Sequence, residues 1–332
     1  MAARVLYCRV RIRVLGRQLG IGSRRSGTGS LVFDHGEHQR ATACLRRFPG
    51  GIPAPDRAFH DIQFRGYAVS VRRLAEAGPG RVTQSPLSDQ YAPAEIRKYE
   101  AIYGRHFVSP GGEGCARDCV TRLNLAPGDR VLDVGSGLGG SAFLMATDYG
   151  ARVHGIDLSA DMVALATQKC RQQGLQDLVS FEQADCLDLT VSQVYEAIYS
   201  RDVILHIENK ARLFQVLRAA LVPGGRLLIT DYCRGEGESS AEFDDYVAQR
   251  GYHLVTVVEY TECLRQAGLE AVLGEDWTAR FIDIHRRELQ RLPSAGLDAD
   301  EESAMRQHWQ EKIARAERGK QCWGLFTARR KN

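Results

Sequence analysis

From about Ser88 onward, short apolar runs alternate with segments of helical length. The apolar runs predict strands at 131–134, 153–156, 179–182, 197–199 and 226–230, and segments 141–149 and 160–173 predict helices. Strands that alternate with helices favour a parallel sheet with helices on both faces. The pattern therefore predicts an α/β fold with a doubly wound, mostly parallel sheet.

Residues 1–85 lack this regularity. Gly, Pro and Arg recur there without a sustained helical or strand period, and the first 33 residues contain no Asp or Glu. This composition predicts a poorly ordered, Arg-rich extension, followed by one globular domain over 86–332. Two alternatives stay open for the extension. It could be a mitochondrial transit peptide or, with weaker support because no aromatic residues are interleaved with the arginines, a nucleic-acid-binding arm.

Charge also separates the two parts. Residues 1–80 carry 14 Arg, no Lys and 5 Asp or Glu, a net charge of +9, and the remainder of the chain carries −6. The main domain is therefore not expected to bind nucleic acid.

Charged residues interrupt every apolar run before it reaches the roughly 20 residues that span a bilayer. The 9 cysteines include no C-x-x-C pair, so we expect no metal site and thiols kept reduced in the cytoplasm.

A glycine-rich loop follows the strand at 131–134. Gly135, Gly137 and Gly140 allow a tight turn and let backbone amides approach a ligand. Asp157, at the end of the next strand, could accept hydrogen bonds from both hydroxyls of a ribose. The same G-x-G-x-x-G spacing is typical of nicotinamide-dinucleotide enzymes, so a dehydrogenase stays an alternative.

Two further features favour S-adenosylmethionine. Asp133 lies in the string Leu-Asp-Val-Gly-Ser-Gly-Leu-Gly, which resembles the first motif of class I methyltransferases, and Ala184-Asp185-Cys186 resembles the pair that holds the adenine in those enzymes. The resemblance implies a Rossmann-like sheet of seven strands. For Asp157 and Asp185, the alternative role is that of a loop cap.

Beyond the fourth strand, an ordered series of segments resembles the phosphoethanolamine N-methyltransferase family of plants, nematodes and malaria parasites. The segments are 199–206, 221–233, 243–246, 249–252, 275–282 and 322–326. Upstream, segments 89–91, 99–104 and 108–112 resemble the helical lid of that family. The resemblance covers roughly residues 88–330. With the motifs above, it implies cofactor contacts at Ser109, Asp133, Gly135, Gly137, Asp157, Leu158, Asp185, Cys186 and Arg201.

Methyl transfer from a sulfonium to an amine requires an aligned donor and acceptor and a nitrogen that has lost its proton. His206 is the natural base, and the resemblance pairs it with Tyr91 of the lid. Asp202, one helical turn before His206, can offer a carboxylate to the positive charge that grows with each methylation. The alternatives are a helix N-cap for Asp202 and a structural histidine for His206.

The other end of such a substrate is a dianionic phosphate. By resemblance, its contacts are Tyr232, Tyr246, Arg250, Tyr252 and Lys312, with Gln90 and Tyr99 as further substrate contacts from the lid. Two cations and three phenol groups suit a phosphate better than a carboxylate or an aliphatic amine. The alternative for each tyrosine is packing in the core.

The sequence therefore predicts an S-adenosylmethionine-dependent enzyme that methylates phosphoethanolamine, or its mono- and dimethyl forms, to phosphocholine. Two alternatives stay open, an N-methyltransferase for other small molecules such as glycine derivatives and a non-catalytic cofactor-binding module. We expect a monomer because no exposed apolar stripe stands out. We expect it in the cytoplasm, with the mitochondrion as the alternative that the Arg-rich N-terminus suggests.

Overall fold

The computed structural model describes the backbone of residues 7–14, 17–25, 31–33, 62–64, 67–69 and 93–332, and side chains from Ile96 onward. The chain divides into two compact units, Met1–Gln84 and Ser85–Asn332. This division falls close to residue 85, where the sequence pattern changes.

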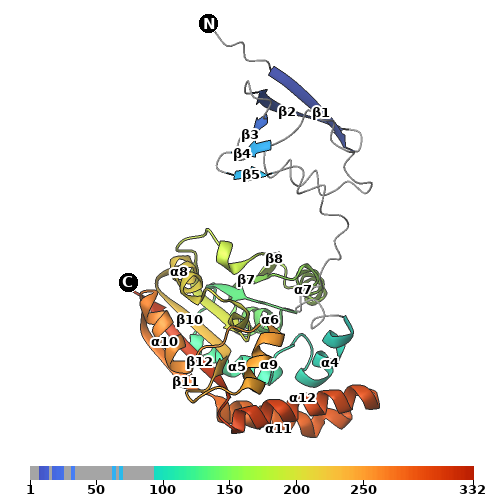
Figure 1. The fold of residues 1–332 in the computed structure, drawn as a ribbon, viewed down its shortest axis with the longest axis vertical. Coiled ribbons are helices and arrows are strands. Elements are labelled where there is room, and N and C mark those ends of the chain that lie inside the picture. Colours follow the sequence, from blue (N-terminus) through green and yellow to red (C-terminus); the bar gives the residue numbers. More distant parts are fainter. Residues whose placement is uncertain (1–6, 15–16, 26–30, 34–61, 65–66, 70–92) are drawn as a thin grey trace. The chain divides into compact units, whose positions relative to one another are not determined.

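The first unit contains a five-stranded sheet, in which the order of the strands follows the sequence (Figure 1). Its strands are β1 (Tyr7–Val14), β2 (Arg17–Arg25), β3 (Leu31–Phe33), β4 (Ile62–Phe64) and β5 (Tyr67–Val69). The antiparallel pair β1 and β2 is its longest ladder. No strand period in the sequence indicated these strands. The expectation of poor order across residues 1–85 is not tested by them and stays a prediction.

The second unit is built on a seven-stranded sheet of order β11-β12-β10-β9-β6-β7-β8. Strands β6, β7, β8, β9 and β10 run parallel, and β12 runs antiparallel to both β10 and β11. The strands are β6 (Arg130–Val134), β7 (Arg152–Asp157), β8 (Val179–Gln183), β9 (Tyr195–Arg201), β10 (Leu221–Arg234), β11 (Leu269–Asp276) and β12 (Gln321–Arg330). The prediction of a doubly wound, mostly parallel sheet is confirmed.

Helices connect the strands and add a layer at one end of the sheet (Figure 1). They are α4 (Pro93–Tyr103), α5 (Gly112–Leu123), α6 (Gly140–Tyr149), α7 (Ala160–Gln173), α8 (Lys210–Ala220), α9 (Ala241–Arg250), α10 (Val257–Gln266), α11 (Thr278–Arg291) and α12 (Ala299–Glu317). Three short 3-10 turns join them, η1 (Cys186–Asp188), η2 (Ile204–His206) and η3 (Leu292–Ser294).

Both faces of the sheet are buried. Successive strand residues point to opposite faces, so Val131 and Tyr199 belong to one core cluster, whereas Leu132 and Ile198 belong to the other. Burial on both faces explains why the central strands appear in the sequence as continuous apolar runs rather than as alternating patterns.

Local signals set the ends of several helices. The Ser159 hydroxyl accepts the amide of Met162 at the start of α7, and Gly174 ends that helix in the left-handed conformation with φ 67°. A capping box between Asp298 and Glu301 starts α12. These caps fix where the two helices begin, and α7 packs beside the glycine loop, because its Met162 shares a core cluster with Leu138 of that loop.

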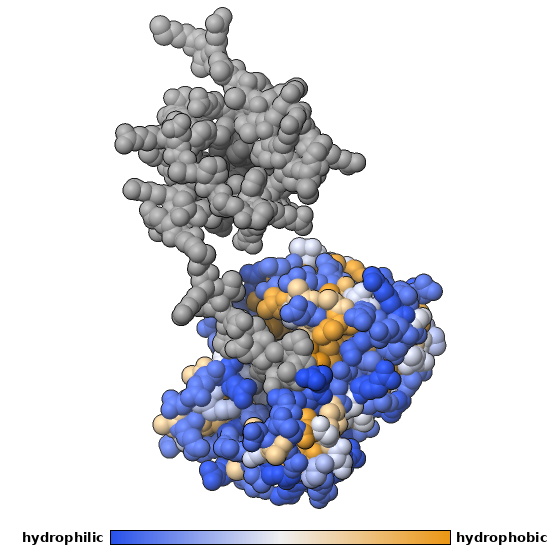
Figure 2. All heavy atoms as spheres, turned by 90° about the vertical axis from the view of Figure 1, so that its right-hand side faces the viewer, coloured by the Kyte–Doolittle hydropathy of each residue, from blue (hydrophilic) through white to orange (hydrophobic). Residues whose placement is uncertain are grey.

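The surface of the second unit is mostly polar on the face drawn in Figure 2, where hydrophobic side chains gather in a few patches. None of the helices in the described part of the chain is long and apolar enough to cross a bilayer.

Candidate functional site

The glycine loop lies at the carboxyl edge of the parallel strands. Gly135 follows β6 with φ 72°, and a Cβ there would come within 2.3 Å of the Val203 side chain. Gly137 has φ 52°, and its amide donates to Asp157 Oδ2 at 2.9 Å. Gly135 is therefore required both by its positive φ and by the lack of space for a side chain, whereas Gly137 is required by its positive φ.

Asp157 joins the loop to the next helix. Its Oδ1 accepts the amide of Ser159 at 2.9 Å, while Oδ2 accepts the amide of Gly137. Burial raises the pKa of Asp157, and these backbone donors oppose the rise. A carboxylate oxygen accepts more than one hydrogen bond, so this structural role leaves Asp157 able to contact a ligand as well.

A pocket beside the loop brings together five of the predicted cofactor residues, which are Ser109, Asp133, Gly135, Gly137 and Arg201. Asp133 is 2% exposed, and its Oδ2 has no hydrogen-bond partner among the described residues. Burial and the neighbouring Asp157 raise the pKa of Asp133 to about 7, although Arg201 opposes them. A buried carboxylate oxygen without a partner marks a place where a ligand donor or cation fits.

Arg201 ties this pocket to the segment between α4 and α5. Its Nη1 donates to the carbonyl of Gly112 at 3.1 Å, and its Nη2 donates to the carbonyl of Pro110. Ser109 lies in the same turn, where its carbonyl accepts the amide of Gly112. Arg201 therefore positions the wall of the pocket, because its charged donors hold backbone carbonyls of that wall.

The remaining cofactor candidates lie at the ends of β7 and β8. The Asp185 side chain is exposed and accepts the amide of Leu187, so it caps η1, as the loop-cap alternative supposed. Leu158 is 60% exposed, whereas Cys186 is buried, and burial raises the pKa of its thiol to about 12. An exposed leucine beside Asp157 offers an apolar surface to a flat ring.

His206 ends η2, which Lys210 holds in place. The buried Lys210 ammonium donates to the carbonyls of Ile204 (3.0 Å), Ile207 (2.9 Å) and His253 (2.7 Å). Burial, together with the charges of Lys210 and His253, lowers the pKa of His206 to about 4. His206 is therefore neutral at physiological pH and keeps an unprotonated ring nitrogen, although the same low pKa makes it a weak base in the ligand-free site.

Tyr252 adjoins His206 and links it to two further tyrosines. The ring of Tyr252 stands edge-on to His206 at 5.1 Å, to Tyr232 at 6.4 Å and to Tyr246 at 6.0 Å. Tyr252 and Tyr232 are buried within a core cluster, so the packing role that was the alternative also holds for them. The Tyr246 hydroxyl is buried without a hydrogen-bond partner in the described part of the chain.

Cations flank this tyrosine cluster (Tyr232, Tyr246 and Tyr252). Lys312 Nζ donates to the Tyr232 hydroxyl at 3.3 Å, and Arg250 Cζ lies 5.9 Å from the centre of the Tyr246 ring. Burial and the charges of Arg250 and Arg315 lower the pKa of Lys312 to about 8. The tyrosines and cations predicted to meet a phosphate are therefore close neighbours, and a chain of ring contacts links them to His206.

Asp202 differs from the expectation. It lies between β9 and η2 in the left-handed conformation, with φ 57°, so it does not share a helical turn with His206. The N-cap position of η2 belongs to Val203, which also rules out the capping alternative. Asp202 Oδ1 accepts Trp323 Nε1 at 2.7 Å and Thr230 Oγ1 at 3.2 Å, whereas its buried Oδ2 has no partner in 96–332.

The predicted lid contacts are described only in part. Gln90 and Tyr91 lie outside the described residues. Tyr99 stacks on Tyr103 at 5.8 Å, and Tyr103 in turn lies 6.0 Å from Trp309 of α12. Three residues that adjoin the site were not predicted. One is Trp323, the donor to Asp202, and the other two are His308 and Arg315 of α12. Together with Lys312, His308 and Arg315 follow the helical spacing i, i+4, i+7, which could have indicated one basic face.

Three features define the class I methyltransferase fold. They are a glycine loop after the first parallel strand, an acidic residue at the end of the second, and a seven-stranded sheet with one antiparallel strand near its edge. A family model described as a methyltransferase domain matches residues 125–269. Phosphoethanolamine N-methyltransferase 1 of Zea mays is 42% identical over 246 residues, which are 72% of this chain and 49% of that protein. The Plasmodium falciparum phosphoethanolamine N-methyltransferase is 35% identical over 252 residues, 73% of this chain and 93% of that protein.

A solved structure agrees with these relatives. Phosphoethanolamine N-methyltransferase 2 of Haemonchus contortus, in complex with phosphomonomethylethanolamine and S-adenosylhomocysteine, matches with a TM-score of 0.72 at 30% identity, over 75% of this chain and 60% of that chain. The chain belongs to the phosphoethanolamine N-methyltransferase family. It spans about half the length of the maize relative. Membership decides against the dehydrogenase alternative.

Proposed function

We propose that this chain transfers a methyl group from S-adenosylmethionine to the amine of phosphoethanolamine, or of its mono- and dimethyl forms, and so makes phosphocholine. The observation that carries the proposal is the tyrosine cluster with its flanking cations, joined to a neutral His206 through Tyr252. The names of the maize and Plasmodium relatives and the ligands of the Haemonchus structure support the same reaction.

The residues of the glycine loop fit S-adenosylmethionine. The unpartnered Oδ2 of Asp133 suits the α-ammonium group of its amino acid portion, because a buried carboxylate gains most from a charged donor. Asp157 would accept the ribose hydroxyls, while Leu158, Asp185 and Cys186 would surround the adenine. When bound, S-adenosylmethionine supplies a methyl group on a positively charged sulfur.

At the amine end, His206 would accept the proton that the ammonium group must lose before its lone pair can attack. The low pKa of His206, about 4, keeps the imidazole unprotonated but weakly basic, and the phosphate of a bound substrate would raise that pKa by adding negative charge nearby. Lys210 fixes the turn that carries His206. Asp202 Oδ2, which has no partner in the described part of the chain, can attract the substrate nitrogen as methyl groups add permanent positive charge. Tyr91 and Gln90 are proposed to close the site from the lid.

At the phosphate end, Lys312 and Arg250 would supply charge, and the hydroxyls of the tyrosine cluster would supply neutral donors. Tyr99 is proposed as a further lid contact. The phosphate would anchor the substrate with its amine toward His206, so the recognition of one end would align the other.

The proposal is tested by incubating the purified full chain with S-adenosylmethionine and, separately, phosphoethanolamine, its monomethyl form and its dimethyl form. We expect methylated product, identified by mass spectrometry, from at least one of the three. Sarcosine serves as the control, since it offers an amine and a carboxylate without phosphate. Turnover of sarcosine without turnover of any phosphobase would contradict the proposal.

We also infer that the enzyme acts as a monomer. The large hydrophobic residues exposed in the described part are Leu158, Val191, Val258 and Leu273, which belong to separate elements rather than to one stripe. Light scattering during gel filtration tests this inference, and a dimer at micromolar concentration would contradict it.

The seven described cysteines are free thiols, which supports the reducing cytoplasm as the compartment. Localisation of the tagged full chain to mitochondria would contradict that assignment.

A further inference from the structure

Arg315 of α12 lies against the tyrosine cluster. Its Cζ is 3.9 Å from the centre of the Tyr246 ring, closer than Arg250, whose Cζ is 5.9 Å from the same ring. Arg315 Nε donates to Gln321 Oε1 at 3.2 Å, and Nη1 lies 3.8 Å from the exposed Glu311. The remaining nitrogen, Nη2, is buried without a hydrogen-bond partner within residues 96–332. One guanidinium edge is therefore left for another acceptor.

A second unpaired donor accompanies Arg315. The Tyr246 hydroxyl, on the ring that Arg315 covers, is also buried without a partner in the described structure. Buried donors without acceptors cost free energy and need an explanation. A ligand that offers several acceptor oxygens at one point would satisfy both of them.

Three cations surround this point. Arg250, Lys312 and Arg315 lie close enough to act on one another, because the two arginines lower the pKa of Lys312. Burial, together with the same three cations, holds the pKa of His308 well below its usual range. The buried Glu288 and Asp202 act on Lys312 and offset part of this charge, whereas the ion pair of Arg315 with Glu311 is long and exposed at the acid and offsets little of it. Three cations beside two unpaired donors still favour a multivalent anion.

We propose that Arg315 is a phosphate-binding residue that sets the preference for a dianionic substrate, donating through Nη2 beside the Tyr246 hydroxyl. The inference rests on the proposed function, which it deepens by adding a third cation to Arg250 and Lys312. A planar guanidinium stacked on a ring is rigid, so Arg315 presents its free edge without the loss of much side-chain entropy. A carboxylate substrate would leave part of this donor set unsatisfied.

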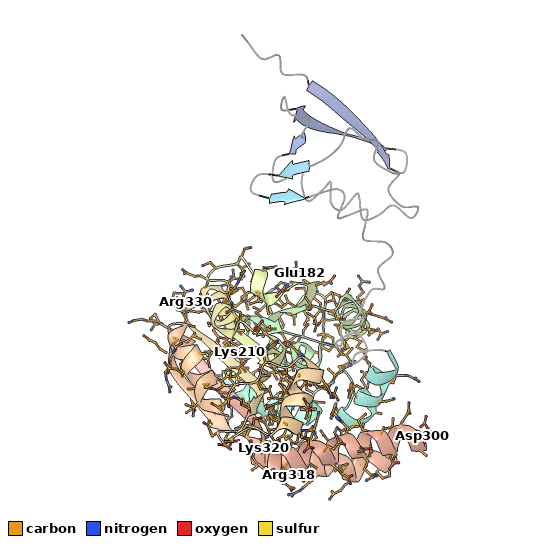
Figure 3. The ribbon with its side chains drawn as sticks, viewed as in Figure 1. Glu182, Lys210, Asp300, Arg318, Lys320 and Arg330 are labelled. Atoms are coloured by element: carbon orange, nitrogen blue, oxygen red, sulfur yellow. The ribbon has the colours of Figure 1, made fainter. Side chains whose placement is uncertain are left out.

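The test compares Arg315→Gln, Arg315→Lys and Arg318→Gln in the full chain. Arg318 is exposed at the carboxyl end of the same helix and serves as the matched control (Figure 3). For Arg315→Gln we expect the KM for the phosphobase, and the inhibition constant of inorganic phosphate, to rise about 10- to 100-fold. The KM for S-adenosylmethionine should stay within about twofold, and Arg315→Lys should restore part of the loss. Arg318→Gln should behave as wild type.

A structural role for Arg315 predicts a different outcome. Glu311→Gln removes the ion pair and leaves the guanidinium in place, so it should retain the wild-type KM. The proposal is overturned if Glu311→Gln reproduces the defect of Arg315→Gln, or if Arg315→Gln changes the KM for the phosphobase less than about twofold. If the wild-type chain methylates no phosphobase, the proposed function fails. Calorimetry with inorganic phosphate then tests separately whether Arg315 binds phosphate. Equal phosphate affinity of wild type and Arg315→Gln would overturn that role of Arg315.

Discussion

The two halves of the site bury unpaired polar atoms of opposite kinds. The half at the glycine loop buries a carboxylate oxygen of Asp133 without a partner in residues 96–332, whereas the half at the tyrosine cluster gathers Arg250, Lys312 and Arg315 and buries Arg315 Nη2 and the Tyr246 hydroxyl without partners in the same range. An unpaired buried polar atom is costly, so the first half favours a ligand that donates and the second a ligand that accepts. The first suits the ammonium end of an amino-acid-like cofactor, and the second suits a phosphate. His206 and Asp202 are the residues proposed to act on the amine, where the two halves meet.

The largest effect is expected where the halves meet. His206→Ala removes the proposed base, so kcat should fall by about 100- to 10,000-fold while the dissociation constant for S-adenosylmethionine changes little. Single-turnover rates and calorimetry measure the two quantities separately. His253→Gln is the matched control, since the His253 side chain is exposed and its hydrogen bonds to Lys210 and Leu205 come from the backbone, which the substitution keeps. An equal loss of turnover and cofactor binding would show that His206 has a structural role.

The cationic half should respond at the phosphate. Lys312→Met removes one charge-assisted donor, and we expect a 10- to 100-fold weaker dissociation constant for phosphoethanolamine, about 1.5–3 kcal/mol. Because the pKa of Lys312 is lowered to about 8, its ammonium form is lost as the pH rises through that value. Affinity should therefore decrease above about pH 8 in the wild type.

Lys312→Arg sharpens this second prediction. Arginine keeps its charge throughout the range, so the alkaline loss of affinity should disappear even if the fit is poorer. Calorimetric titrations from about pH 7 to pH 9 test this. An affinity that stays constant for wild type over this range would argue that Lys312 does not contact the phosphate.

The halves also differ in how far the sequence predicted them. The glycine loop, β7 and Asp157 are consecutive, so their hydrophobic pattern and spacing were enough to place them at one sheet edge. The tyrosine cluster and its cations come from β10, α9, the turn after α9 and α12, and only the family resemblance brought Tyr232, Arg250 and Lys312 together. Arg315 was missed although its spacing from His308 and Lys312 indicates one basic face, because nothing local in the sequence connects that face to Tyr246.

Other misses have particular physical causes. Asp202 was expected on a helical turn with His206, but its left-handed backbone separates β9 from η2, and a propensity argument does not foresee φ 57° at an aspartate. Strands β11 and β12 were not predicted individually, because neither has an alternating pattern: β11 is largely exposed, and β12 is buried almost continuously with a glycine in its middle. The central strands were found because they are buried on both faces.

The acidic half should respond at the cofactor. Asp133→Asn removes the charge next to the proposed ammonium contact, and the dissociation constant for S-adenosylmethionine should rise about 10-fold. Since the pKa of Asp133 is raised to about 7, wild-type affinity should fall as the pH is lowered through 7, and the variant should lose this dependence. Asp161→Asn, at an exposed position in the first turn of α7, is the control. The idea fails if Asp133→Asn binds S-adenosylmethionine as tightly as wild type.

The smallest effect separates two roles of Asp185, a cap of η1 and a contact to the adenine. Asp185→Ala removes both roles, and loss of the cap should lower the free energy of unfolding by about 1 kcal/mol. Asp185→Asn keeps a capping oxygen and removes only the charge, so its stability should match wild type. If the carboxylate also contacts the adenine, both variants should bind S-adenosylmethionine about two- to fivefold more weakly, because an exposed hydrogen bond contributes little. If Asp185 acts only as a cap, thermal melts should separate the two variants, while calorimetry should show that both bind the cofactor as tightly as wild type. This result would confine the cofactor contacts of the acidic half to the glycine loop and Asp157.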